Sequence, residues 1–131
     1  DHDFEWRIVK IGESYFGHQK IKKGDKASGT KGIKYILPPD KYMDFVYALC
    51  KKYKFNCMAV DLFEDGNGRL LVNELQTNFG HVQDHICEKN GKPGRQLFVD
   101  NKWVFEEGDF NKNLSYDLRL ADAISLLKKV K

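Results

Sequence analysis

The stretch Met58–Gly80, MAVDLFEDGNGRLLVNELQTNFG, decides the predicted fold. Segments rich in Val, Leu and Met lie on both sides of Glu64–Gly68, which supplies acidic residues, Asn and Gly for a turn. Such a pattern is typical of two strands joined by a tight connection. We therefore expect a β-hairpin with strands at 57–63 and 69–76.

Three residues of this hairpin carry oxygen atoms that suit a metal ion. Side chains alternate between the faces of a strand, so Glu74 and Gln76 share one face. A four-residue loop would place Asp61 on the same face, opposite Glu74 or one diagonal away. Like charges that face each other across two strands repel, so a cation is expected between them. Two carboxylates and an amide oxygen suit magnesium, which substrate phosphates often complete.

Other interpretations of the hairpin remain open at this point. Most hairpins with a few acidic residues simply have a solvated face. A β-bulge in either strand would turn Asp61 to the other face and remove the argument. An EF-hand is excluded, because Phe63 and Val72 would occupy ligand positions of its calcium loop.

The pattern apolar-apolar-Asp, acidic Gly turn, apolar-apolar-x-Glu-x-amide resembles the metal-binding hairpin of ATP-grasp enzymes. The resemblance implies that Asp61, Glu74 and Gln76 hold Mg²⁺, or Mn²⁺ in its place, against the phosphates of ATP. The family usually has Asn at the third position and Pro-Gly soon afterwards. This chain has Gln76 followed by Asn78–Gly80, so Asn78 is the alternative third ligand.

The segments Phe4–Ile11 and Ser14–Ile21 alternate as two strands joined by a Gly-Glu turn. They resemble the opening strands of the second ATP-grasp lobe, in the branch that includes ribosomal-protein glutamate ligases. The resemblance implies that Arg7 and Lys20 point toward phosphates. The alternative for each is a solvated strand position. His18 matches no motif, and we expect it to be structural.

A loop rich in Gly and Lys follows at 22–34 and has no periodicity. Its backbone amides and lysines could cradle an anion. In the ATP-grasp relatives a loop at this point approaches substrate or phosphate, and the candidates here are Ser28, Gly29, Thr30 and Lys31. A plain solvated connection is the alternative.

Two helices are expected from apolar residues at helical spacing. The first covers 40–53 and starts after Pro38-Pro39. Its apolar stripe marks it as scaffold that packs on the sheet: Tyr42, Phe45, Val46, Leu49, Cys50 and Tyr53. The second covers 114–130 and is capped by Asn113 or Ser115. Its apolar face either braces the sheet or meets another chain: Leu120, Ala123, Ile124, Leu127 and Val130.

Composition agrees with one small domain. The chain has 131 residues, of which 41% are hydrophobic and 31% charged, typical of a soluble globular protein. No apolar run approaches the roughly 18 residues that cross a membrane. A net charge of +3 permits an anionic small ligand and is weak evidence for nucleic acid.

Cysteine usage and the first residue complete the sequence-based expectations. Three cysteines, Cys50, Cys57 and Cys87, have no metal-type spacing, so we expect free thiols in the reducing cytoplasm. The sequence starts at Asp1 without an initiator Met, which suggests a piece of a longer protein.

The expected fold is α+β, an antiparallel sheet with packed helices that resembles the second, C-terminal subdomain of the ATP-grasp fold. Residues 1–81 would form the lobe with the metal-binding hairpin. Residues 82–131 would add a second hairpin, with strands at 96–99 and 102–105, and the last helix.

The resemblance implies an ATP- and Mg-dependent carboxylate–amine ligase. In such ligases a substrate carboxylate attacks the γ-phosphate, and an amine then displaces phosphate from the acyl phosphate. Arg7 would hold the transferred group, and Asp61 and Glu74 would be ligands rather than bases. Nothing in the chain resembles the first ATP-grasp lobe, so we expect no ligation without that lobe or a second chain, for example in a homodimer.

Two other classes are weighed against this function. The chain could be a non-catalytic interaction domain derived from an ATP-grasp lobe, which the Gln76 departure favours. It could also be a hydrolase that uses Asp61 and Glu74 as acid and base. The hydrolase requires one of the two carboxyl groups to have a raised pKa.

Overall fold

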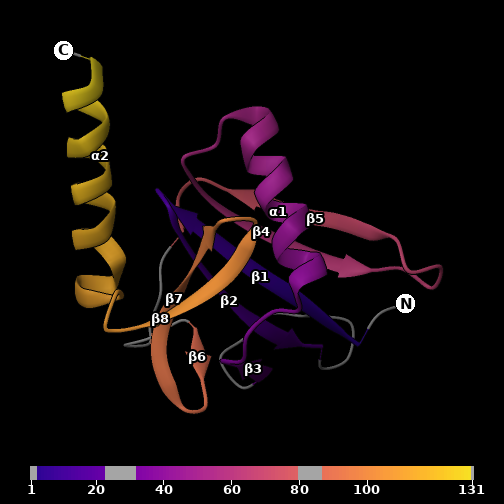
Figure 1. Cartoon of the computed structure of the whole chain (residues 1–131). Coiled ribbons are helices and arrows are strands. Elements are labelled where there is room, and N and C mark those ends of the chain that lie inside the picture. The colour runs from indigo at the N-terminus through magenta and orange to yellow at the C-terminus, as the bar shows by residue number, and fades with distance from the viewer. Residues whose placement is uncertain (1–2, 23–31, 80–86, 131) are drawn as a thin grey trace.

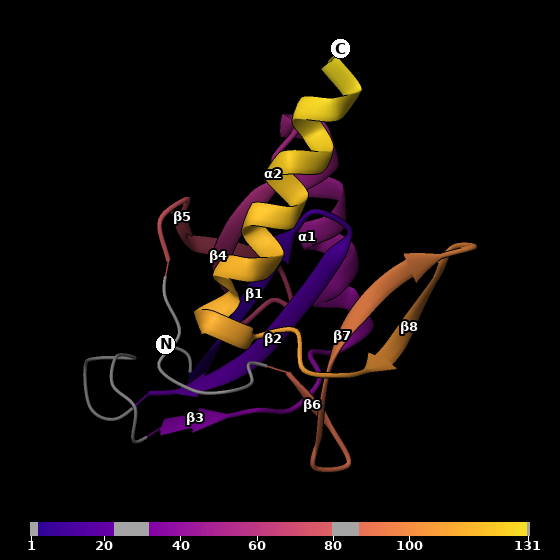
Figure 2. The same ribbon diagram turned by 90° about the vertical axis from the view of Figure 1, so that its left-hand side faces the viewer.

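The computed structural model describes residues 3–22, 32–79 and 87–130. Within these ranges eight strands form one antiparallel sheet, with the order β5-β4-β1-β2-β7-β6, while β3 pairs with β2 and β8 with β7. The helices α1 (Asp40–Tyr53) and α2 (Tyr116–Val130) lie on opposite faces of this sheet (Figures 1 and 2). The expected α+β class with an antiparallel sheet is confirmed. The strands are β1 (Phe4–Ile11), β2 (Ser14–Ile21), β3 (Ile33–Lys34), β4 (Cys57–Glu64), β5 (Leu70–Gln76), β6 (Glu88–Lys89), β7 (Lys92–Val99) and β8 (Lys102–Glu107).

The first hairpin has the strand bounds predicted from the sequence. β1 and β2 pair continuously from Phe4 opposite Ile21 to Ile11 opposite Ser14. Gly12 in the turn has φ +57°, a conformation that costs little only for glycine. The space beside its Cα is filled by the carboxylate of Asp122 from α2, so a Cβ there would collide with it.

One face of the sheet is covered by α1. The helix buries Met43, Val46 and Cys50 against Ile8 and Val60 of the central strands. The bounds predicted for this helix are confirmed.

The predicted stripe of α1 needs two corrections. Met43 belongs to the buried face, whereas Tyr53 is 55% exposed and stacks on Phe55 at the end of the helix. The helix ends there because Lys54 adopts a left-handed conformation.

The opposite face of the sheet carries a second, smaller core. Its buried members are Val9, Ile11, Phe16, Ala59, Phe79 and Cys87. Leu118 of α2 packs against this core. The sheet is therefore an inner layer with an apolar cluster on each side, and α2 closes only part of the second one.

The last helix starts two residues later than predicted. A 3₁₀ turn at Lys112–Ser115 precedes it, and Asn113, Leu114 and Ser115 all have positive φ. Neither predicted cap forms. The Ser115 hydroxyl is buried without a hydrogen-bond partner among the described residues, and the Asn113 amide donates to Asp117.

The second hairpin is longer than predicted. β7 and β8 extend the expected strands to Lys92 and Glu107, and Asp100 and Asn101 at the turn both have positive φ. β7 pairs with β2 only through Tyr15 and Gln96, and the hairpin projects from the sheet (Figure 2). The predicted domain division at 81/82 lies outside the described residues.

All three cysteines are free, as expected. Among the described helices, none is both long and apolar enough to span a membrane.

Candidate functional site

The hairpin of β4 and β5 brings Asp61 opposite Glu74, but by a route the sequence did not indicate. The loop has five residues, because Glu64 pairs with Leu70. With that register alone, Asp61 would lie opposite Asn73 and Glu74 would point to the other face. A register shift between Asp61 and Leu62 leaves Asn73 as the extra residue and puts Glu74 opposite Asp61. The four-residue loop on which the predicted facing was conditional does not form, and the bulge produces the same facing instead.

The loop itself is held by the side chain of Asp65. One carboxylate oxygen of Asp65 accepts hydrogen bonds from the backbone N–H groups of Asn67 and Arg69, each at 2.9 Å. These backbone bonds lower the pKa of Asp65. The loop therefore has a rigid closure that helps to fix the register of the strands.

Asp61 lies at the centre of an ion cluster built from three neighbouring strands. Its side chain is almost fully buried, since the residue is 2% exposed. Arg7 of β1 donates from Nε to Oδ1 and from Nη2 to Oδ2, both at 2.7 Å. Lys20 of β2 donates to Oδ2 at 2.5 Å. The carboxylate is thus held by a bidentate guanidinium and by an ammonium group.

These contacts decide the protonation state of Asp61. Burial alone raises its pKa, but the hydrogen bonds from Arg7 and Lys20 act in the opposite direction, and the pKa is lowered overall. The same hydrogen bond raises the pKa of Arg7, with a smaller contribution from the charge of Glu74. Asp61 is therefore a fixed anion at neutral pH and does not meet the requirement of the hydrolase hypothesis for a raised pKa.

Gln76 and Glu74 complete the cluster on the same face. The Gln76 Oε1 accepts a hydrogen bond from Arg7 Nη2 at 3.1 Å, and Glu74 is exposed beside Asp61. We call Arg7, Lys20, Asp61, Glu74 and Gln76 the Asp61 cluster. Its formal charge is neutral, with two cations and two carboxylates.

The structure thus brings five of the sequence-predicted site residues together. The four loop candidates, Ser28, Gly29, Thr30 and Lys31, lie outside the described residues. Asn78, the alternative third ligand, is exposed just after β5.

The cluster shares its face of the sheet with α2 but not its position along the strands. Arg7 lies four residues before the Ile11 end of β1, and α2 contacts the sheet at that end through Gly12 and Asn56. The Asp61 cluster therefore lies beside α2 and not under the contacts that hold α2 to the sheet.

Donor chemistry at the cluster suits a hard cation only in part. Asp61, Glu74 and Gln76 offer three oxygen donors on one face, but Asp61 and Gln76 already accept hydrogen bonds from cationic side chains. Oδ2 of Asp61 accepts two of these bonds, from Arg7 and Lys20, whereas Oδ1 accepts one and keeps a second lone pair for a cation. Within the described residues, no group of three or more His, Cys, Asp and Glu is placed to hold a metal ion.

Sequence reasoning missed the pairing of Arg7 and Lys20 with Asp61. A signal for it was present, because Arg7 stands between the apolar residues Trp6 and Ile8 in a central strand, and a charge in that setting needs a partner. Sequence reasoning also missed that Asn73, the bulged residue, donates to Glu5 at 3.0 Å.

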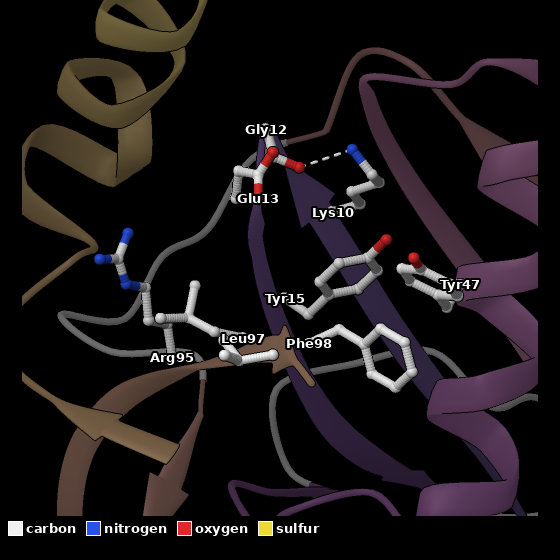
Figure 3. A pocket seen from close by; sticks show the side chains of 9 residues that line it. Lys10, Gly12, Glu13, Tyr15, Tyr47, Arg95, Leu97 and Phe98 are labelled. Atoms are coloured by element: carbon white, nitrogen blue, oxygen red, sulfur yellow. Dashed lines mark hydrogen bonds between the residues drawn. The ribbon is translucent and has the colours of Figure 1, made fainter. Parts of the chain in front are cut away.

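A cavity of about 490 Å³ lies on the α1 side of the sheet, away from the cluster (Figure 3). Tyr15, Tyr47 and Phe98 form its aromatic wall, and Lys10 at its rim donates to the Gly12 carbonyl at 2.5 Å. Burial strongly raises the pKa of Tyr15, so its hydroxyl stays protonated. None of the predicted site residues lines this cavity.

In comparisons with known proteins, no family model matched the chain, and no curated protein matched it either.

Proposed function

We propose that this chain is the C-terminal lobe of an ATP-grasp carboxylate–amine ligase that binds Mg-ATP at the Asp61 cluster. One observation carries the proposal, namely that Asp61 and Glu74 face each other with Gln76, Arg7 and Lys20 around them. Two acidic ligands and two cations on one open sheet face are what a metal–phosphate complex requires.

The neutral charge of the cluster predicts how such a complex binds. A divalent cation alone would compete with Arg7 and Lys20 for Asp61, and like charges would then lie close together. A triphosphate brings negative charge that both cations can accept. Arg7 and Lys20 would then donate to phosphate oxygens, while Asp61, Glu74 and Gln76 hold the metal ion. We therefore propose that the nucleotide and the metal bind together and that the metal alone binds weakly.

Each side chain has a separate task in this scheme. A magnesium ion held by Asp61, Glu74 and Gln76 would supply positive charge to the transferred phosphoryl group. Arg7, with its bidentate donors, orients that group, and Lys20 supplies a second positive charge from the neighbouring strand. The contacts to the carboxylate substrate, to the amine and to the adenine ring come from the first lobe or from another chain. This C-terminal lobe alone therefore ligates nothing.

Isothermal titration of the chain tests this proposal. We expect binding of ATP in the presence of Mg²⁺, and weaker binding of ATP or Mg²⁺ alone. Glu74→Gln removes one ligand charge without changing shape and should weaken Mg-ATP binding at least tenfold, or about 1.4 kcal/mol. Glu107→Gln, at an exposed carboxylate of β8, is the matched control and should bind as the wild type does. Equal Mg-ATP binding by wild type and Glu74→Gln would contradict the proposal.

A second candidate function has its own supporting observation. Asp61 is nearly fully buried, and both its oxygens are taken up by Arg7 and Lys20, as in a purely structural ion cluster. The chain would then be a non-catalytic interaction domain derived from the same lobe. This candidate predicts no Mg-ATP binding at all, together with a loss of stability when Asp61 is replaced.

A further inference from the structure

Helix α2 presents its most apolar face to solvent. Leu120, Leu127 and Val130 are 62%, 68% and 85% exposed, and Ile124 is 43% exposed. None of the residues of α2 is buried. An amphipathic helix in a single domain normally turns this stripe inward, so the orientation requires an explanation.

A different side of α2 holds it to the sheet. Leu118 packs against the second core, Asp122 accepts a hydrogen bond from Asn56, and Arg119 donates to the Phe79 carbonyl at 2.5 Å. The Arg119 guanidinium also lies 3.9 Å from the centroid of the Phe79 ring. These residues lie within one turn of each other and fix which side faces outward.

The exposed stripe has the spacing of a coiled-coil seam. Its members recur at intervals of four, three, four and three residues: Tyr116, Leu120, Ala123, Leu127 and Val130. This interval is the heptad pattern of two helices that pack side by side. Figure 2 shows α2 in front of the sheet, with its outer side clear of the other elements.

The charged residues of α2 favour a second copy of this helix as the partner of the exposed stripe, in antiparallel orientation. Asp117 and Lys128 are eleven residues apart, about three helical turns, and so lie on the same flank of the seam. In an antiparallel pair of identical helices, Asp117 of each copy approaches Lys128 of the other. In a parallel pair the same flank of the two copies lies on opposite sides of the seam, so Asp117 and Lys128 would not meet. The antiparallel pair also opposes the two helix dipoles.

We propose that a second copy of this chain covers the stripe, so that two α2 helices pack antiparallel and form a homodimer. The Asp61 cluster takes no part in this contact, so the proposal does not depend on the proposed function. A seam of one 15-residue helix is smaller than the interfaces of about 1,200–2,000 Å² in stable complexes. The dimer should therefore dissociate on dilution.

Sedimentation velocity over a concentration series tests the proposal. The wild type should shift from 15.2 kDa toward twice that mass, about 30 kDa, as concentration rises. Leu127→Glu should hold the chain as a monomer over the same range. Ser125→Glu adds the same charge on the same helix but off the seam, and should leave the mass shift unchanged. Circular dichroism of each variant confirms that the helix is intact.

Charge variants test the direction of the pair. Asp117→Lys should weaken association at least tenfold, and adding Lys128→Asp in the same chain should restore it. A monomer at every concentration would overturn the proposal and assign the stripe to a different protein. A dimer unaffected by Leu127→Glu would overturn it as well, because the contact would lie elsewhere.

Discussion

At the scale of single residues, Asp61 links β4 to β1 and β2 through its side chain. It is buried, ionised and matched by two cations from neighbouring strands. Removing one partner of a buried ion pair leaves the other charge uncompensated, which costs more than the pair itself contributes.

Asp61→Asn should therefore destabilise the chain strongly. We expect the free energy of unfolding to fall by about 3 kcal/mol, because Arg7 and Lys20 lose an anionic acceptor. Asp100→Asn, at an exposed turn position with positive φ, is the control and should change stability by less than about 0.5 kcal/mol. Urea unfolding measures both, and equal stability of the two variants would show that the cluster is solvated.

The ionisation of Asp61 should make the stability of the fold depend on pH. The pKa of Asp61 is lowered in the folded state, so its ion pairs stabilise the fold above the unfolded pKa of about 3.9. This stabilisation is lost as the pH falls through the lower, folded pKa. The gap in unfolding free energy between wild type and Asp61→Asn should therefore shrink below about pH 4. A gap that stays constant from neutral to strongly acidic pH would contradict the assignment.

The sequence predicted that Asp61 faces Glu74 on the condition of a four-residue loop, whereas the facing arises from a five-residue loop and a bulge. A five-residue loop and a bulge at Asn73 each reverse the facing, and together they cancel. A sequence does not mark a bulge clearly, because Asn73 resembles any polar strand residue until its bond to Glu5 is known. The sequence indicated that Arg7 needs a partner but not that the partner is Asp61, since strand pairing between β1 and β4 joins residues far apart in sequence.

At the scale of elements, the local sequence pattern was sufficient to predict the bounds of those strands and helices whose bounds depend on neighbouring residues. The bounds of β1, β2 and α1 follow from alternation, a Gly turn and Pro38-Pro39. The start of α2 was predicted two residues early, because positive φ at Asn113 and Leu114 delays the helix. Its periodicity was correct, but periodicity does not say which side of a helix faces the sheet.

The contact between α2 and the first hairpin makes Gly12 a sensitive position. Gly12→Ala should destabilise the chain by more than about 1 kcal/mol, because it adds both backbone strain and a collision with Asp122. Gly91 also has positive φ but open space around it, so Gly91→Ala should cost about 1 kcal/mol from strain alone. Thermal unfolding compares the two, and an equal loss would show that Asp122 moves away freely.

At the scale of the whole molecule, the sheet order could not be read from the sequence. β5, β4, β1 and β2 form the part predicted by hairpins, whereas β7 joins it through a short ladder at Tyr15 and Gln96 and a hydrogen bond from Arg95 to Ser14. This short ladder leaves β7 and β8 to diverge from the sheet, with the aromatic cavity beside Tyr15 (Figure 3). The result is a molecule whose two faces differ, one closed by α1 and one that carries the Asp61 cluster.

The most direct test of the central claim is paramagnetic broadening of backbone amide signals by Mn²⁺, with and without ATP. The account predicts broadening of Asp61, Glu74 and Gln76 when Mn²⁺ and ATP are both present, and little broadening with Mn²⁺ alone, because the neutral cluster resists a bare cation. Broadening at another surface, or none under either condition, would contradict the assignment of this hairpin as a metal–nucleotide site.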